Sequence, residues 1–225
     1  MVLKPPRAER LAIPGPAGPL QALIETPQSE HGEPLTVPAF AVVCHPHPLF
    51  GGTLDNKVVY TVARAFEQLG APAIRFNFRG VGASAGSYDE GRGESDDALA
   101  VIAFGRRRWP GVPLWLAGFS FGGAVAARIA GAARPQRLVL VAPGVTRLER
   151  ADFDAARAAQ PECPWLIVQG DADDVVPADA VLAWAGSREP PPGVPRPVAS
   201  LLPGAGHFFH GRINELRDAV LAFMR

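Results

Sequence analysis

The chain has 225 residues, of which 48% are hydrophobic, so it is long enough for a single domain over residues 1–225 with a sizeable core. Its 22 basic and 22 acidic residues give a net charge of zero, which argues against a nucleic-acid partner. The N-terminus lacks an apolar segment of signal-peptide length, and no run of about 18 uncharged apolar residues occurs, which together predict a cytoplasmic protein without a membrane partner. Cys44 and Cys163 are the only cysteines, and such sparse use predicts buried free thiols in a reducing compartment.

An antiparallel hairpin is predicted at the start of the chain. Residues 11–13 and 20–25 read as two strands that flank a Gly-Pro-Ala-Gly turn at 15–18, and a hairpin of this kind suits the edge of a sheet. The Pro-rich stretches 27–38 and 189–197 lack core-forming residues and are expected to be loops.

Strand and helix patterns alternate from about residue 37 to the end of the chain. Short apolar runs bounded by turn residues predict strands at 38–44, 71–78, 113–117, 137–141, 164–169 and 198–202. Apolar residues at helical spacing predict helices at 55–69, 93–108, 121–133, 178–185 and 213–224. This alternation predicts an α/β fold with a mostly parallel sheet, helices on both faces, and ligands beyond the carboxyl ends of the strands.

The most informative motif is a G-x-S-x-G pattern at residues 118–122, between a predicted strand and a predicted helix. A serine on such a sharp turn has strained dihedrals, and the close packing of strand and helix leaves room only for glycine two residues before and after it. The context predicts Ser120 as a nucleophile and the backbone N–H of Phe121 as an oxyanion donor. A second such pattern, around Ser84, is followed by no helix and reads as a flexible loop.

A serine nucleophile needs a general base and a group that orients this base. His207 follows the last predicted strand directly, after glycines that permit a close approach to the sheet, and is predicted as the base. Asp171, Asp173 and Asp174 follow another strand, and each is a candidate for the carboxylate that holds the imidazole. Their loop lacks the alternating oxygen ligands and closing glutamate of a calcium loop, so no metal or other cofactor is predicted.

The order Ser…Asp…His resembles that of the α/β-hydrolase superfamily. In that family the acid stands in an Asp-x-x-Val-Pro segment, and only Asp173 matches this pattern, so the resemblance implies a triad of Ser120, Asp173 and His207. Residues 78–84 are similar to the family's Arg-Gly-x-Gly-x-Ser loop, in which Arg79 and Ser84 organise the loop.

The segment after the first parallel strand is similar to the family's His-Gly-x-Pro oxyanion segment, with Pro46 in place of the glycine. The family's second oxyanion donor maps by position to the backbone N–H of His47. Since Pro46 and Pro48 cannot donate, His47 and then Leu49 carry the nearby N–H groups. His45 is expected to have a structural role in the turn.

Apolar side chains near the motifs predict an apolar mouth to the site. The predicted substrate-binding residues are Leu49, Phe50, Phe119 and Phe208, although core packing accounts for at least half of the phenylalanines near the motifs. Larger family members insert a cap after the strand that ends at residue 141. Here only the short segment 142–163 follows, so the resemblance implies a minimal cap or none, with this segment or the Gly-rich loop 80–93 as a thin cover.

The resemblance implies a serine hydrolase that cleaves an ester or thioester of a small molecule through an acyl-enzyme. A serine at position 120 excludes the dehalogenase chemistry of the superfamily, which places an aspartate there. The His-Pro-His-Pro, Gly-Gly-Thr and Asp-Asn-Lys elements of residues 45–57 further resemble a group of small, mostly uncharacterised bacterial hydrolases. A peptidase or amidase with the same triad and a non-catalytic ligand-binding protein are the alternatives. The sequence leaves acyl length, leaving group and oligomeric state open.

Overall fold

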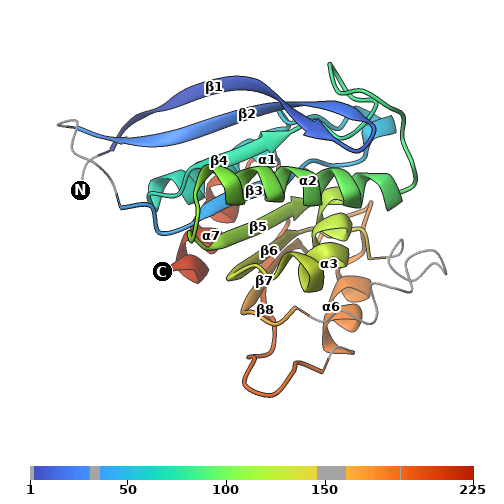
Figure 1. Cartoon of the computed structure of the whole chain (residues 1–225). Coiled ribbons are helices and arrows are strands. Elements are labelled where there is room, and N and C mark those ends of the chain that lie inside the picture. Colours follow the sequence, from blue (N-terminus) through green and yellow to red (C-terminus); the bar gives the residue numbers. More distant parts are fainter. Residues whose placement is uncertain (1–2, 31–35, 146–160, 188) are drawn as a thin grey trace.

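A computed structural model describes residues 3–30, 36–145, 161–187 and 189–225. They form an eight-stranded sheet in the order β1-β2-β4-β3-β5-β6-β7-β8 (Figure 1). The strands are β1 (Leu3–Gly15), β2 (Gly18–Ser29), β3 (Phe40–Cys44), β4 (Ala73–Phe76), β5 (Leu114–Phe119), β6 (Arg137–Val141), β7 (Trp165–Gly170) and β8 (Val198–Leu202). Strands β3 to β8 run parallel to one another, whereas β1 and β2 form an antiparallel hairpin, and β2 pairs antiparallel with β4. The predicted parallel sheet with an antiparallel edge hairpin is confirmed.

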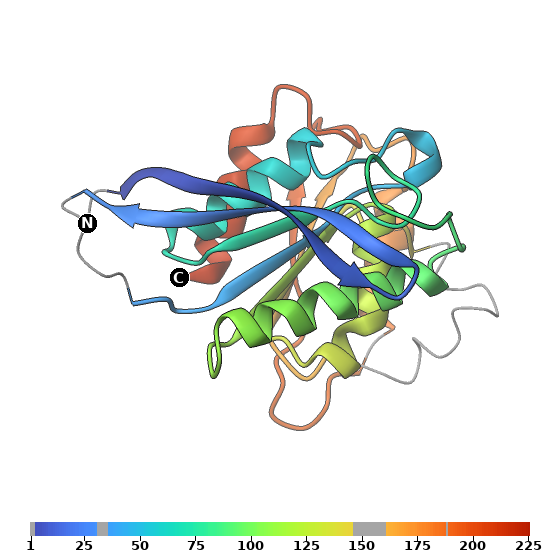
Figure 2. The same ribbon diagram turned by 45° about the horizontal axis from the view of Figure 1, so that its top comes forward.

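Helices cover both faces of the sheet (Figure 2). They are α1 (Lys57–Gln68), α2 (Arg92–Arg108), α3 (Phe121–Ala133), α6 (Ala178–Gly186) and α7 (Ile213–Met224), with a short 3₁₀-helix, η1 (Pro48–Phe50). Side chains alternate along each strand, so Phe40 and Val42 of β3 pack with α2 and α3, while Ala41 and Val43 pack with α1 and α7. In the described part of the chain, no helix is both long and apolar enough to span a membrane.

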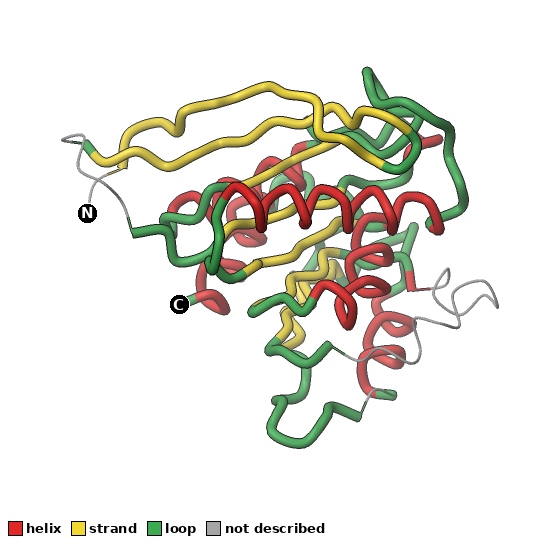
Figure 3. Tube along the Cα trace, viewed as in Figure 1, coloured by secondary structure: helices red, strands yellow, loops and turns green. Residues whose placement is uncertain are grey.

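The N-terminal hairpin is longer than its sequence pattern predicts (Figure 3). Leu3 pairs with Ser29 at its open end, so β2 extends into the Pro-rich stretch that was predicted as loop. The register shifts between Lys4 and Arg7, which accommodates two prolines in β1. Proline lacks a ladder donor and is tolerated at bulges and on edge strands, and β1 is an edge strand.

Both cysteines are buried free thiols, as predicted. Burial raises the pKa of Cys44 far above its ordinary value and that of Cys163 to about 11, so neither is a thiolate at neutral pH. The possible cover at 142–163 lies largely outside the described residues, since 146–160 are not part of them.

Candidate active site

Ser120 occupies the turn between β5 and α3 with a φ of 54° and a ψ of −117°, a backbone conformation that costs energy in any residue with a side chain. Its N–H donates to the Val141 carbonyl at 2.9 Å. A Cβ on Gly118 would lie 2.0 Å from the carbonyl oxygen of Gly122, and a Cβ on Gly122 would lie 2.4 Å from that of Cys44. The two glycines of the motif are therefore required by close backbone contacts around the serine.

The side chains of Ser120, His207 and Asp173 form one hydrogen-bonded chain. Ser120 Oγ lies 3.0 Å from His207 Nε2, and His207 Nδ1 lies 2.8 Å from Asp173 Oδ2. Asp173 follows β7 and His207 follows β8, and a Cβ on Gly170 would lie 2.1 Å from the Ala205 carbonyl oxygen. The close approach of these two loops brings His207 and Asp173 together above the ends of their strands.

Asp173 accepts more hydrogen bonds than the one from His207. Its Oδ1 accepts from the N–H groups of Val175 at 2.9 Å and Val176 at 2.8 Å, and its Oδ2 accepts from Gln169 Nε2 at 3.0 Å. Burial raises the pKa of Asp173, but the bonds from His207 and the backbone outweigh it, so the pKa lies below its usual value. The carboxylate is ionised at neutral pH. Sequence reasoning missed Gln169, whose signal is a polar residue near the end of an otherwise apolar strand.

The other two acids of this loop have no contact with His207. Asp171 Oδ1 accepts from the Gly204 N–H at 2.6 Å, which ties the β7 loop to the β8 loop. Asp174 is exposed. Of the three candidates, the structure brings only Asp173 to the histidine.

His45 holds the loop after β3 in place. Its Nε2 accepts from the Phe78 N–H at 3.0 Å, so its Nδ1 carries the proton and donates to the Pro46 carbonyl at 2.6 Å. Burial lowers the pKa of His45 to about 4; the bond to Pro46 opposes this shift and the charge of His47 adds to it. A neutral, fully buried imidazole with both nitrogens bonded has the structural role that the sequence predicted.

His47 caps η1 and packs beside the turn of the nucleophile. Its Nδ1 accepts from the Leu49 N–H at 3.2 Å, so the Leu49 N–H is already engaged. Its Nε2 therefore carries the proton and donates to Tyr88 Oη at 3.2 Å. The rings of His47 and Phe121 have centroids 5.0 Å apart. The Gly-rich loop thus contributes Tyr88 to the site, a residue that the sequence analysis did not identify.

The segment around Ser84 is a loop, as predicted, and side chains anchor the Gly-rich loop at two points. Arg79 donates to both carboxylate oxygens of Asp97, at 3.0 and 2.8 Å. Ser84 Oγ donates to the Asn77 carbonyl at 2.7 Å and accepts from the Gln21 N–H at 2.9 Å. Arg79 and Ser84 organise this loop, as the resemblance implied.

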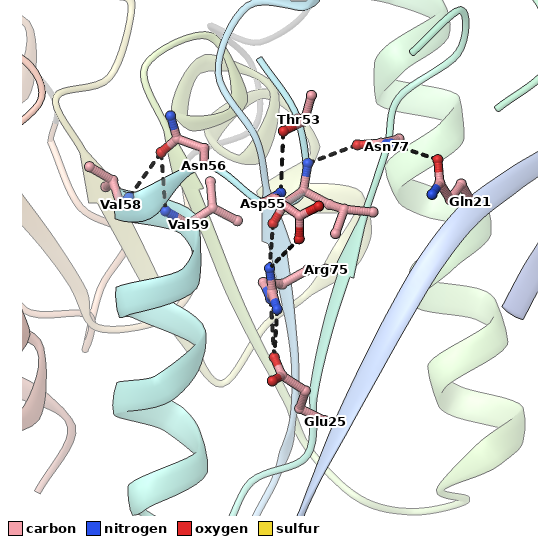
Figure 4. Close-up of polar contacts among 10 residues, drawn as sticks. Gln21, Glu25, Thr53, Asp55, Asn56, Val58, Val59, Arg75 and Asn77 are labelled. Carbon is pink, nitrogen blue, oxygen red and sulfur yellow. Dashed lines mark hydrogen bonds and ion pairs between the residues drawn. The ribbon is translucent and has the colours of Figure 1, made fainter. Parts of the chain in front are cut away.

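A buried polar network fixes the far end of the loop between β3 and α1 (Figure 4). The Leu54 N–H donates to Asn77 Oδ1 at 2.7 Å, and the Leu54 carbonyl accepts from Arg75 Nη1 at 2.6 Å. Arg75 Nη2 also pairs with Glu25 of β2 at 2.8 Å. The N-terminal hairpin and β4 together therefore position the segment that ends at α1.

A cavity of about 350 Å³ opens beside Ser120 and His207. The other residues that line it are Pro46, His47, Phe50, Gly51, Gly52, Asn56, Val175 and Phe208. Within the described residues, its lining includes no aspartate, glutamate, lysine or arginine. The cavity is therefore suited to an uncharged ligand. A cluster of three side chains able to hold a metal is likewise not found among the residues that the structure describes.

Two of the four predicted substrate-binding residues line this cavity. Phe50, at 82% exposure, and Phe208 lie at its mouth. Leu49 is exposed but does not line it. The prediction for Phe119 is wrong, because this residue is 1% exposed and packs in the core. Side chains of a strand point alternately to its two faces, and that of Phe119, at the end of β5, points into the core. Its ring centroid lies 5.0 Å from that of His207. Val175 was missed; it is an exposed apolar residue next to the Asp173 loop.

Comparisons with known proteins agree with this architecture. The family model described as serine aminopeptidase, S33, matches residues 51–151, which include Ser120 but neither Asp173 nor His207. An uncharacterised protein of Rickettsia prowazekii is 34% identical over 183 residues, which cover 80% of this chain and 76% of that protein.

Solved structures are similar over nearly the whole chain. XC6422 from Xanthomonas campestris, described as an α/β serine hydrolase without lid, is 40% identical, with 100% of this chain and 97% of that chain covered and a TM-score of 0.86. An α/β serine hydrolase homologue from Coxiella burnetii is also 40% identical, with 96% and 97% covered and a TM-score of 0.83. At these identities and coverages the relationship extends beyond the fold, and the chain belongs to the α/β-hydrolase superfamily of serine hydrolases.

Proposed function

We propose that this protein hydrolyses an ester or thioester of a small, uncharged molecule through a covalent acyl-enzyme. The observation that carries the proposal is the hydrogen-bonded chain from Ser120 Oγ through His207 to Asp173, with steps of 3.0 and 2.8 Å, beside a cavity of about 350 Å³. A serine hydroxyl is a weak nucleophile until an adjacent base removes its proton, and His207 is such a base in this proposal.

In the proposed reaction, His207 Nε2 takes the proton from Ser120 Oγ as the oxygen attacks the carbonyl carbon. Asp173 keeps Nδ1 protonated and stabilises the imidazolium that forms. The imidazolium then protonates the leaving alcohol or thiol, and the acyl group stays on Ser120. A water molecule, deprotonated by His207, attacks the acyl-enzyme and releases the acid.

The developing oxyanion is held by the backbone N–H groups of Phe121 and His47 in this proposal. Phe121 is the first residue of α3, where the helix dipole favours negative charge. The ring contact between His47 and Phe121 supports the second donor, because it brings the two backbone segments together next to Ser120. One such donor contributes roughly 3 kcal/mol to the stabilisation of the transition state.

A peptidase or amidase is the second candidate, because the matching family model is described as a serine aminopeptidase. An aminopeptidase must bind the free ammonium group of its substrate, and a buried ammonium requires a negatively charged or several polar partners. The described lining of the cavity offers no carboxylate for this purpose. This argues against an aminopeptidase substrate, and the anilide substrates below test amide hydrolysis in general.

The test compares hydrolysis of p-nitrophenyl acetate, butyrate and octanoate with that of the matching anilides. In Ser120→Ala, ester hydrolysis is expected to fall by about 10⁴-fold or more, whereas Ser84→Ala keeps the activity per folded molecule. Undiminished rates in Ser120→Ala would reject the nucleophile. Turnover of anilides in preference to esters would establish the amidase, and ligand binding without any turnover would establish a binding protein.

A further inference from the structure

Asn56 is an N-cap whose amide orientation is fixed by the helix that it precedes. Its Oδ1 accepts from the N–H groups of Val58 at 2.9 Å and Val59 at 3.4 Å, at the start of α1. Because the oxygen must face these donors, the amide nitrogen is turned away from the helix (Figure 4). Within the described residues, Asn56 Nδ2 makes no hydrogen bond to the protein.

The same side chain lines the cavity that contains Ser120 and His207. The remaining polar side chain of the described lining is His47, whose two ring nitrogens already face the Leu49 N–H and the Tyr88 hydroxyl. Asn56 therefore contributes to the cavity lining a side chain whose amide is oriented by the N-cap bonds, and neither the fold nor the proposed proton relay uses its donor. A donor locked in advance loses little conformational entropy when it binds.

We propose that Asn56 Nδ2 donates a hydrogen bond to a neutral oxygen of the substrate other than the scissile carbonyl. The substrate class is then an ester or thioester that carries a second oxygen, as an ether, hydroxyl or carbonyl group. An anionic oxygen is disfavoured because no lysine or arginine of the described residues lines the cavity. This inference rests on the proposed function. A neutral hydrogen bond of this kind changes kcat/KM by about 2- to 10-fold.

Matched ester pairs that differ only in one oxygen in place of a methylene group test the inference. On the acyl side they are p-nitrophenyl methoxyacetate against butyrate, 3-methoxypropionate against valerate, and 4-methoxybutyrate against hexanoate. On the alcohol side the pair is 2-methoxyethyl acetate against butyl acetate. The quantity compared between variants is the ratio of kcat/KM within a pair, because the intrinsic reactivity of each ester cancels in that comparison.

The informative variant is Asn56→Asp, since aspartate caps a helix about as well as asparagine but has no donor when ionised. The control is Asn214→Asp, the same chemical change at an exposed position of α7 that does not line the cavity. For at least one pair, the kcat/KM of the ether ester divided by that of the alkyl ester is expected to be about 2- to 10-fold higher in the wild type and in Asn214→Asp than in Asn56→Asp. Equal ratios in all three proteins for every pair overturn the inference.

A second readout requires no turnover. In Ser120→Ala, the ¹H–¹⁵N signals of the Asn56 amide, identified by their loss in Ser120→Ala/Asn56→Asp, are expected to shift with an ether ester and not with its alkyl counterpart. A wild type that hydrolyses no ester but shows this shift would reject the proposed function and retain the donor role of Asn56. Ester hydrolysis without a ratio change or a shift would reject the donor role alone.

Discussion

Burial keeps two titratable side chains of the fold uncharged at pH 7. His45 is neutral at pH 7 because burial lowers its pKa to about 4. Glu67 of α1 is protonated there, because burial and the nearby Glu25 raise its pKa to about 8, against the opposing effects of Arg64 and Arg75. In each case removal from water disfavours the charged form. These residues do not titrate as their residue types would suggest.

Glu67 should therefore reduce the stability of the fold at high pH. The pKa of Glu67 in the fold lies above the ordinary 4.5. Its contribution to the free energy of unfolding is therefore fully present below pH 4.5 and is lost as the pH rises through about 8. Glu67→Gln cannot ionise and should lose less stability on going from pH 6 to pH 9 than the wild type does, by a few kcal/mol at most. Urea unfolding at the two pH values measures this difference. An identical pH dependence in both proteins would show that Glu67 is ionised in the fold.

At the scale of single elements, the strand-turn-helix unit of β5 and α3 is positioned by backbone contacts rather than by side chains. The carbonyl oxygens of both Cys44 and His45 lie 2.4 Å from where a Cβ on Gly122 would be. Cys44 ends β3 and His45 begins the loop that follows it. The N-terminus of α3 can approach this loop so closely only because position 122 has no side chain.

Gly122→Ala should consequently push α3 away from the loop after β3. We expect a loss of about 3 kcal/mol or more in the free energy of unfolding, together with loss of activity. Gly186→Ala is the matched control, because nothing lies within 4 Å of a Cβ at this last residue of α6. It should be neutral or gain up to about 1 kcal/mol. Thermal unfolding of the two variants compares them, and equal melting temperatures would contradict the steric argument.

At the scale of the whole molecule, the edge hairpin and the loop between β3 and α1 form one connected structure. Arg75 is buried in β4 and donates both to Glu25 of the hairpin and to the Leu54 carbonyl of that loop. A hairpin distant in sequence from Ser120 thus helps to position the loop beside it. Mutation can separate the contribution of this ion pair to the free energy of unfolding from the role of Arg75 in positioning the Leu54 carbonyl.

Arg75→Met should lower the free energy of unfolding by roughly 3 to 5 kcal/mol, because it leaves Glu25 buried and unpaired. Glu25→Met/Arg75→Met should recover most of this stability, since an apolar pair of similar volume often replaces a buried ion pair without net cost. Its kcat should stay below that of the wild type, as the Leu54 carbonyl still lacks its donor. Chemical unfolding and ester hydrolysis separate the two effects, and a fully active double variant would exclude the positioning role.

Local patterns were sufficient for the order of the elements and for the place of Ser120 at the turn between β5 and α3. The apolar periodicity gave the boundaries of α3 and β6 to the residue, because each element buries one or both faces and its period is written in neighbouring positions. The glycines at 118 and 122 marked the turn at Ser120, since its steric requirement is local. The length of β1 was underestimated because pairing with a partner strand overrides the weak strand propensity of proline.

Contacts between segments distant in sequence required the folded structure. Tyr88 reaches His47, and Phe119 turns into the core behind His207, both through packing that no single segment encodes. The orientation of the Asn56 amide is likewise visible only once α1 and the cavity are both in place. A side chain's type and position in the chain predict what it can bind, whereas the neighbours that the fold brings to it determine which of its atoms remain available.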